Sequence, residues 1–289
     1  MADLGHRDEL AVYPNGQVAL SGQLLRLFRR LDDIFVGWSA AHGAIEHLFP
    51  PILPASALAR IDYLSSFPHL ATFPATLASD EDNLATFVAG VGAGASMTCA
   101  QPVALTELSP VNDVLTPAAC YHCYLRYQGV SLDGPLVLTT RATCFRREAS
   151  YTPLERLWSF SMREIVCLGT LGEVETFLAA QRAVVTAFVH RIGLASEWKA
   201  ATDPFFRAAQ NPKHLAQRLD PVKAELVFDD RLAIASVNLH RNYFGEAFEI
   251  TRNGEPAYSG CVAFGLERWI AAVVSAFGPT DWPDELSAG

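Results

Sequence analysis

Apolar residues recur at helical spacing in several parts of the chain. Between residues 17 and 50 the apolar face consists of Leu20, Leu24, Leu25, Phe28, Leu31 and Phe35. Such a repeat predicts an amphipathic helix. A second helix is predicted over 171–193, where the pattern closes at a glycine, a residue often found just after a helix C-terminus. Residues 203–219 are expected to be partly helical, and 49–70 to mix prolines with a short amphipathic segment.

Segments typical of β-strands lie between these helices. They are rich in β-branched and aromatic residues, are broken by turn signals, and span 113–145, 157–169 and 223–252. The last part of the chain, 257–278, predicts a strand that runs into a helix. Strands joined by short turns, with helices between them, predict an α+β fold in which an antiparallel sheet is flanked by helices.

The whole chain, residues 1–289, is expected to form one domain. Hydrophobic residues make up 50% of it and charged residues 18%, which is a globular composition. Within this domain, 1–45 is predicted to be an N-terminal helical extension and 203–222 a helical insertion. The sequence lacks both an apolar run of the roughly 18–20 residues that a membrane helix needs and the features of a secretory signal in residues 1–10. We therefore expect a cytoplasmic protein with no membrane partner.

The charge balance and the cysteines narrow the class of protein further. The net charge of −9, from 22 basic and 31 acidic residues, argues against sequence-independent binding to nucleic acid, which needs clustered Lys and Arg. The cysteines are scattered through a mid-sized chain, which does not suggest a disulfide framework. Taken singly, each is expected to be a small buried hydrophobe: Cys99, Cys120, Cys123, Cys144, Cys167 and Cys261.

Residues 144–170 carry the pattern that most directly predicts chemistry. Two strand-like runs flank a loop that contains Pro153, which predicts a hairpin. Because side chains alternate between the faces of a strand, Arg156, Phe160 and Glu164 are expected to share one face of the second run.

The first run of this hairpin presents a second charged pair. Arg146 and Glu148 are likewise expected on one face. Placing a cation, an aromatic ring and a carboxylate opposite another Arg–Glu pair costs free energy unless the group holds a ligand. The hairpin is therefore the candidate ligand site.

The hairpin resembles the second signature motif of class II aminoacyl-tRNA synthetases. That motif has the form F-R-x-E, a loop, and then R-x-x-x-F, and it is found here at 145–148 followed by Arg156 and Phe160. The third motif of the same family ends in G-x-x-R at the start of a helix, and 265–268 has this form. The resemblance implies a class II synthetase-like catalytic fold.

The resemblance also implies roles for the motif residues in binding ATP. Arg146 would contact the α-phosphate and Glu148 the adenine end, while Phe160 would stack on the adenine. Arg156 and Arg268 would hold the γ-phosphate, and Arg146 and Arg268 would be the catalytic residues. Planar guanidinium groups suit these roles because they bind phosphate oxygens in pairs and stabilise charge as an oxygen attacks phosphorus.

Three further residues resemble a zinc site. Cys120, Glu164 and Cys261 match the Cys/Glu/Cys set of atypical seryl-tRNA synthetases and of the small amino acid:[carrier protein] ligases related to them. Three protein ligands leave the fourth zinc position open, as in catalytic sites. The resemblance implies that the amino group of the substrate occupies this position.

A competing interpretation pairs Cys120 with Cys123 as a redox or structural-zinc pair. If 116–127 is a strand, these two side chains point to opposite faces, and pairing them would need a turn. On the same assumption His122 shares the face of Cys120 and is the better spare ligand.

Other features of the family are harder to place in this chain. Mg²⁺ normally bridges the ATP phosphates, and Glu246 and Glu249 are the candidate ligands. The family normally forms a homodimer through its first motif, for which 49–54 is the candidate on the placement of its prolines.

The resemblance to the carrier-protein ligases implies ATP-dependent activation of a small amino acid, glycine or alanine, as an aminoacyl-adenylate. The amino acid is then expected to pass to the phosphopantetheine thiol of an acyl-carrier-type protein. Only about 45 residues precede the predicted core, and with the acidic charge this weakens tRNA as the acceptor. The basic residues of the insertion, as the candidate surface for an acidic carrier, are Arg207, Lys213, His214 and Arg218.

Alternatives stay open at this point. The chain is also compatible with an aminoacyl-tRNA synthetase paralogue that charges tRNA, or with a non-catalytic synthetase-like protein. The retained Arg146, Arg156 and Arg268 argue against a non-catalytic role, because a scaffold has no physical reason to bury unpaired cations. Glycine, alanine and serine are not distinguished by the sequence, since one methyl or hydroxyl group is worth only about 1–3 kcal/mol.

Overall fold

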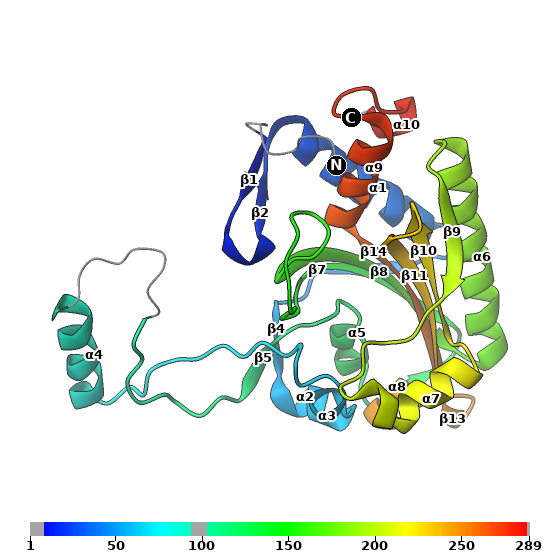
Figure 1. The fold of residues 1–289 in the computed structure, drawn as a ribbon. Coiled ribbons are helices and arrows are strands. Elements are labelled where there is room, and N and C mark those ends of the chain that lie inside the picture. The colour runs from blue at the N-terminus through cyan, green and yellow to red at the C-terminus, as the bar shows by residue number, and fades with distance from the viewer. Residues whose placement is uncertain (1–8, 94–102, 288–289) are drawn as a thin grey trace.

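A seven-stranded sheet forms the centre of the protein (Figure 1). The computed structural model describes residues 9–93 and 103–287. The strand order across the sheet is β3 (Ile45–His47), β7 (Leu136–Phe145), β8 (Ser159–Gly169), β14 (Tyr258–Gly265), β11 (Leu232–Arg241), β10 (Lys223–Phe228) and β9 (Ser196–Ala200). Every neighbouring pair is antiparallel except β3 and β7, which are parallel. The predicted α+β class is therefore confirmed.

Three long helices cover one face of this sheet and form the larger core with it. They are α1 (Gly22–Ala40), α6 (Leu171–Arg191) and α9 (Leu266–Phe277). Aromatic stacking joins α1 to the sheet, with the rings of Phe35 and of Phe264 on β14 4.2 Å apart. Trp269 of α9 is fully buried in the same core. Burial of these large apolar side chains is the main source of stability on this face.

Shorter helices lie on the other face. They are α2 (Ala55–Arg60), α3 (Tyr63–Ser66), α5 (Tyr121–Arg126), α7 (Pro212–Leu219) and α8 (Tyr243–Phe248). Tyr124 of α5 stacks on Phe244 of α8 with 4.0 Å between ring centroids, which anchors a second core. Gly245 allows α8 to pack closely against the backbone of Ala257, because a Cβ at position 245 would lie 2.1 Å from the carbonyl oxygen of Ala257.

The remaining elements are mostly short. They are β1 (Leu10–Val12), η2 (Pro14–Gly16), β2 (Val18–Leu20), β4 (Ile52–Pro54), α4 (Glu81–Ala93), β5 (Asp113–Leu115), β6 (Ser131–Leu132), η3 (Ala208–Gln210), β12 (Thr251–Arg252), β13 (Glu255–Pro256) and α10 (Asp284–Ser287). The helix α4 extends away from the body of the molecule (Figure 1). None of the helices in the described ranges combines the length and apolar composition that a bilayer crossing requires.

Several sequence predictions agree with the structure. The helix predicted over 171–193 is α6, which begins with a capping box between Thr170 and Glu173 and is followed by Gly193 at a φ of +72°. The hairpin predicted over 144–170 is the β7–β8 pair. The cysteines in the described part of the chain are free thiols, as expected. Cys99 and residues 1–8 lie outside the described residues.

Other predictions were wrong in their boundaries or type. The helix expected over 17–50 is α1 alone, because residues 18–20 pair with 10–12 as a hairpin and 45–47 join the sheet. The N-terminal extension is thus a hairpin followed by a helix. The end of the strand segment predicted over 223–252 includes a helix, α8.

The strand predicted over 116–127 is also wrong, because this stretch contains α5. One oxygen of Glu164 accepts hydrogen bonds from the backbone N–H groups of Ala119 and Cys120, at 2.9 and 3.1 Å. These two groups directly precede α5, and a carboxylate placed there stabilises the start of a helix. A residue distant in sequence therefore sets the local structure here.

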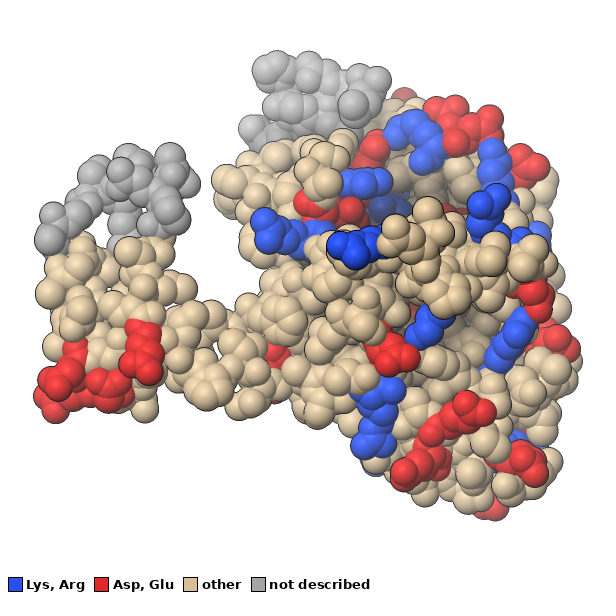
Figure 2. Space-filling view, turned by 60° about the horizontal axis from the view of Figure 1, so that its bottom comes forward, with Lys and Arg blue, Asp and Glu red and all other residues tan. Residues whose placement is uncertain are grey.

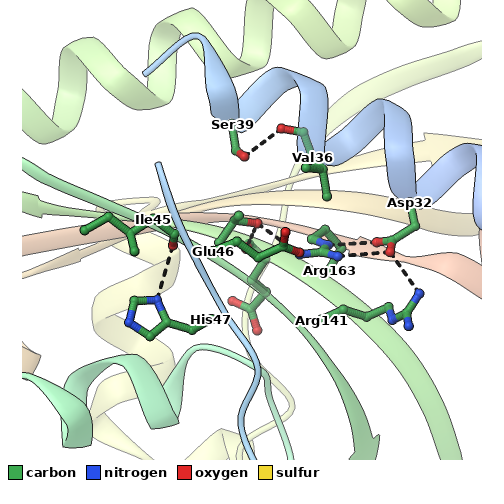
Figure 3. Close-up of polar contacts among 10 residues, drawn as sticks. Asp32, Val36, Ser39, Ile45, Glu46, His47, Arg141 and Arg163 are labelled. Carbon is green, nitrogen blue, oxygen red and sulfur yellow. Dashed lines mark hydrogen bonds and ion pairs between the residues drawn. The ribbon is translucent and has the colours of Figure 1, made fainter. Parts of the chain in front are cut away.

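A charge network centred on the buried pair of Arg163 and Asp32 joins α1 to the sheet (Figure 3). The Arg163 side chain of β8 is only 4% exposed and donates to both oxygens of Asp32, at 2.7 and 2.9 Å. It also donates to Glu46 of β3 at 2.8 Å, while Arg141 of β7 donates to Asp32 at 2.9 Å. The network therefore fixes α1 against three strands at once.

Replacing Asp32 with Ala should leave the Arg163 cation buried with Glu46 as its remaining carboxylate partner. We expect the free energy of unfolding to fall by about 3–5 kcal/mol in urea titrations, as for other broken buried ion pairs. The matched control is Asp33→Ala, since Asp33 is exposed on the same helix. This variant should change the free energy of unfolding by no more than about 0.5 kcal/mol. Equal effects of the two variants would show that the network contributes little.

Candidate active site

A cavity of about 720 Å³ opens on the face of the sheet that carries the short helices. Figure 2, which views the molecule from that side, shows Lys and Arg side chains around the hollowed part of this face. The eight side chains predicted to bind ATP or zinc all line this cavity: Cys120, Arg146, Glu148, Arg156, Phe160, Glu164, Cys261 and Arg268. The structure thus brings together residues that span most of the sequence.

Strand alternation accounts for part of this convergence. Phe160 and Glu164 of β8 face the cavity, whereas Arg163 faces α1. On β14, Cys261 lines the cavity while Val262 is buried in the core beneath the long helices. The alternation expected for β8 is therefore seen at these positions.

Three predicted residues lie beyond the strand ends instead of on a strand face. Arg146 and Glu148 follow the end of β7, and Arg156 precedes the start of β8. The expectation that they share a strand face was wrong, because the ladder between the two strands ends at residues 145 and 159. They reach the cavity from the loop that joins β7 to β8.

Two arginines are held in the cavity by backbone carbonyl groups. Arg146 donates from Nε to the carbonyl of Pro117 at 2.8 Å, and its guanidinium lies over the ring of Phe160, 5.3 Å from the centroid. Arg268 donates to the carbonyl oxygens of Glu155 at 2.8 Å and of residue 233 at 3.1 Å. Burial, and then the nearby charge of Arg146, lowers the pKa of Arg268. Two cations placed this close favour an anion between them.

Arg156 is held less firmly than the other two arginines. Its guanidinium is 3.4 Å from the carboxylate of Glu148, and its side chain is 49% exposed. An ion pair this exposed contributes little to stability. The position of the Arg156 side chain therefore depends on where the loop places its backbone.

The thiol and carboxylate groups form a separate cluster. Cys120 at the start of α5, Glu164 of β8 and Cys261 of β14 are all buried, with their ligand atoms within 4.8 Å of one another. A hydrogen bond with Cys261, followed by burial and by the charge of Glu164, raises the pKa of Cys120 well above its ordinary value. The hydrogen bond with Cys120 lowers the pKa of Cys261, but burial and Glu164 outweigh it and the net shift is upward.

This donor set fits a divalent metal ion. Three acidic groups face one another in a buried space, and a cation among them would favour their ionised forms. Two thiols and a carboxylate are ligands that zinc accepts, and all three residues line the cavity. The same geometry supports the Cys120–Glu164–Cys261 grouping that the resemblance implied.

The alternative ligands are not part of this group. Cys123 is fully buried in the core formed with the short helices. His122 stacks on Phe49 and its Nε2 lies 3.2 Å from the carbonyl of Ile52, so its prediction as a spare ligand was wrong. Because 120–126 is a helical turn and not a strand, the face argument behind that prediction does not hold.

Sequence reasoning missed two residues beside Cys261. Asn238 and His240, at alternate positions of β11, place side-chain nitrogens 3.4 and 3.7 Å from the Cys261 sulfur. Burial lowers the pKa of His240 to about 4, which keeps its imidazole neutral near pH 7. Their alternation along the strand is visible in the sequence, but its meaning depends on the pairing of β11 with β14.

One prediction and one missed residue concern charged side chains near the cavity. Glu246 and Glu249 are exposed on α8 and at its end, and they do not line the cavity. Lys223, missed as a site residue, pairs with Asp203 at 3.0 Å and with Glu225 at 3.1 Å. The contact with Asp203 ties that residue to β10 at the cavity wall.

Comparison with known proteins identifies the family. Amino acid–[acyl-carrier-protein] ligase 1 of Bradyrhizobium diazoefficiens is 37% identical over 249 residues, which are 82% of this chain and 74% of the relative. The chain belongs to the amino acid–[acyl-carrier-protein] ligase family. No protein-family model matches it.

More distant relatives of this ligase-family chain are serine–tRNA ligases. The type-2 serine–tRNA ligase of Methanococcus maripaludis is 23% identical over 290 residues, covering 93% of this chain and 55% of the relative. The M. kandleri seryl-tRNA synthetase, crystallised with A. aeolicus tRNASec, superposes with a TM-score of 0.81 at 19% identity, over 97% of this chain and 57% of that one. The chain thus spans little more than half the length of these ligases, and its fold is the class II synthetase fold.

Proposed function

We propose that this member of the ligase family activates a small amino acid with ATP and transfers it to the phosphopantetheine thiol of an acyl-carrier-type protein. One observation carries the proposal: Arg146, Arg156 and Arg268 line the same cavity as the buried Cys120–Glu164–Cys261 cluster. A site for a polyphosphate thus lies beside a site for a metal-bound amine. The name of the 37% identical relative, an amino acid–[acyl-carrier-protein] ligase, supports a carrier protein as the acceptor of the amino acid.

In the first step an oxygen of the amino-acid carboxylate attacks the α-phosphorus of ATP. The bond from that phosphorus to the bridging oxygen breaks, and pyrophosphate leaves. Arg146 holds the α-phosphate oxygens, and Arg268 with Arg156 holds the γ-phosphate, so that developing charge is stabilised by groups already in place. Phe160 stacks on the adenine, and Glu148 accepts from its amino group.

In the second step the carrier thiol attacks the carbonyl carbon of the adenylate. A carbon–sulfur bond forms, the bond from that carbon to the phosphate oxygen breaks, and AMP leaves while the thiol proton passes to solvent. The sheet face holds the adenylate in place until the thiol arrives, which gains rate by orientation.

Cys120, Glu164 and Cys261 would hold a zinc ion. When bound, zinc would coordinate the uncharged amino group of the substrate and so select an α-amine. Asn238 and His240 support Cys261 from β11. Mg²⁺ would accompany the ATP phosphates.

The insertion is the proposed docking surface for the carrier. Helix α7 has no buried residue, and its Leu215 and Leu219 are 56% and 78% exposed. Arg207 and Arg218 are exposed beside them, which suits an acidic partner. Lys213 is already engaged, because its ammonium lies 3.1 Å from Asp62.

A homodimer through the open edge of the sheet is part of the proposal. The apolar residues Ile45, Leu48 and Ile52 near β3 are 48%, 91% and 42% exposed. Apolar side chains gathered at a sheet edge favour a protein partner. Sedimentation equilibrium at micromolar concentration tests this dimer. A measured mass equal to that of one chain would refute it.

The acceptor is tested directly by supplying the protein with ATP, amino acid and either a pantetheinylated carrier or total tRNA. Mass spectrometry should detect a thioester on the carrier that is lost on treatment with hydroxylamine. The carrier in its unmodified form is the control and should stay unchanged. Charging of tRNA without labelling of the carrier would replace this proposal with the synthetase alternative.

Replacing Arg146 or Arg268 with Ala should lower amino-acid-dependent ATP–pyrophosphate exchange by roughly 100–1000-fold, because each removes a donor to the transition state. Arg147→Ala is the matched control, since Arg147 is exposed and does not line the cavity. Circular dichroism should be the same for the three variants. Exchange at the wild-type rate in Arg146→Ala would refute its assignment to the α-phosphate.

Zinc binding to metal-free protein near pH 7 should release about two protons, because the raised pKa values keep both thiols protonated until metal displaces their protons. Calorimetry in buffers of different ionisation enthalpy measures this number. Cys261→Ser should lose zinc, whereas Cys123→Ser should keep one zinc per chain. Zinc lost from the Cys123 variant and kept by the Cys261 variant would reverse the ligand assignment.

Reversing the charge of Arg207 and Arg218 to Glu should reduce transfer to the carrier at least tenfold while pyrophosphate exchange stays unchanged. The same reversal at Arg26 and Arg29, exposed on α1, is the control. Equal loss of exchange and transfer would mean that α7 acts on the cavity and not on the carrier.

A further inference from the structure

The N-terminal hairpin lies against the loop that carries Arg156. Figure 1 shows β1 and β2 beside the loop between β7 and β8. The backbone N–H of Trp158 donates to the carbonyl of Asn15 at the hairpin tip, at 3.3 Å. Leu10 of β1 and Leu154 of the loop are 8% and 0% exposed and belong to the same buried cluster.

Gly16 makes the closest approach between the two segments. A Cβ built on Gly16 would lie 2.7 Å from the carbonyl oxygen of Arg156 and 2.8 Å from the Cβ of Tyr151. Both distances are below any real carbon contact. Gly16 also has a φ of +71°, a conformation that residues with a side chain rarely adopt. Only glycine therefore fits at the hairpin tip.

The backbone of Arg156 is held from its other side as well. Within the loop, Thr152 and Arg156 exchange two backbone hydrogen bonds, at 2.8 and 2.9 Å. Arg268 donates to the carbonyl of the preceding residue, Glu155, at 2.8 Å. The Arg156 backbone is thus enclosed, whereas its side chain has, among residues 9–93 and 103–287, only the weak pair with Glu148.

We propose that the hairpin of residues 10–20 is a positioning element for ATP binding, which acts through Gly16 on the backbone of Arg156. The inference rests on the proposed function, since it assumes that Arg156 binds the γ-phosphate. A hairpin tip that fixes the backbone sets the direction from which the long side chain reaches the phosphate. Small displacements of a group that positions a reacting substrate weaken binding and lower the reaction rate.

The test compares Gly16→Ala with Gly43→Ala. Gly43 also has a positive φ, of +65°, but a Cβ there would meet nothing within 4 Å, so this variant reports backbone strain alone. In pyrophosphate exchange we expect Gly16→Ala to raise the KM for ATP about tenfold, with the KM for the amino acid and the zinc content unchanged. Gly43→Ala should leave all three unchanged. An ATP KM that is the same in both variants would overturn the proposal.

Double variants separate positioning from general loosening. Added to Arg156→Ala, Gly16→Ala should raise the KM for ATP no further, because the group through which it acts is gone. Fully additive effects would contradict the inference. Leu10→Ala loosens the hairpin without touching the loop backbone and should also raise the KM for ATP. This variant replaces Gly16→Ala in the test if Gly16→Ala does not fold.

A measurement that needs no activity keeps this inference distinct from the proposed function. Amide hydrogen exchange in residues 151–158 should be faster in Gly16→Ala than in Gly43→Ala. Equal protection in the two variants would refute the hairpin's role even if the enzyme is active. Absence of pyrophosphate exchange in the wild type would instead refute the proposed function, and the amide comparison would still decide whether the hairpin holds the loop.

Discussion

The architecture depends on two adjacent residues of β8 that carry opposite charges into opposite faces of the sheet. Arg163 and Glu164 are 3% and 2% exposed, so each charge needs its own compensation. Asp32 and Glu46 supply it on the helix face. On the cavity face, two backbone N–H groups at the start of α5 supply it. A shift of β8 by one residue would exchange the two charges, which fixes the register of the strand.

That register also sets the spacing within the cavity. Phe160 and Glu164 lie on one face of β8, so the arginine over Phe160 and the metal donors around Glu164 share one surface. The pairing of β8 with β14 brings Cys261 next to this surface. The cavity thus combines Phe160 and Glu164 of one strand face with arginines from the loop between β7 and β8 and from α9, and this proximity favours reaction between their ligands.

How much the sequence could predict follows from the range of the interactions involved. Phe160 and Glu164 were placed correctly because alternation along a strand is local. The structure around Cys120 was predicted wrongly because its helical turn starts on a carboxylate 44 residues away. Asn238 and His240 were missed because only the pairing of β11 with β14 brings them next to Cys261, and the sequence does not show that pairing. The roles of the motif residues in binding ATP stay predictions.

The central claim is that this cavity activates an amino acid with ATP. Amino-acid-dependent ATP–pyrophosphate exchange on zinc-loaded protein, screened with glycine, alanine and serine, tests it most directly. The account predicts exchange with at least one of the three, and none after zinc is removed with a chelator. Absence of exchange with every amino acid, on folded protein that retains one zinc per chain, would contradict it.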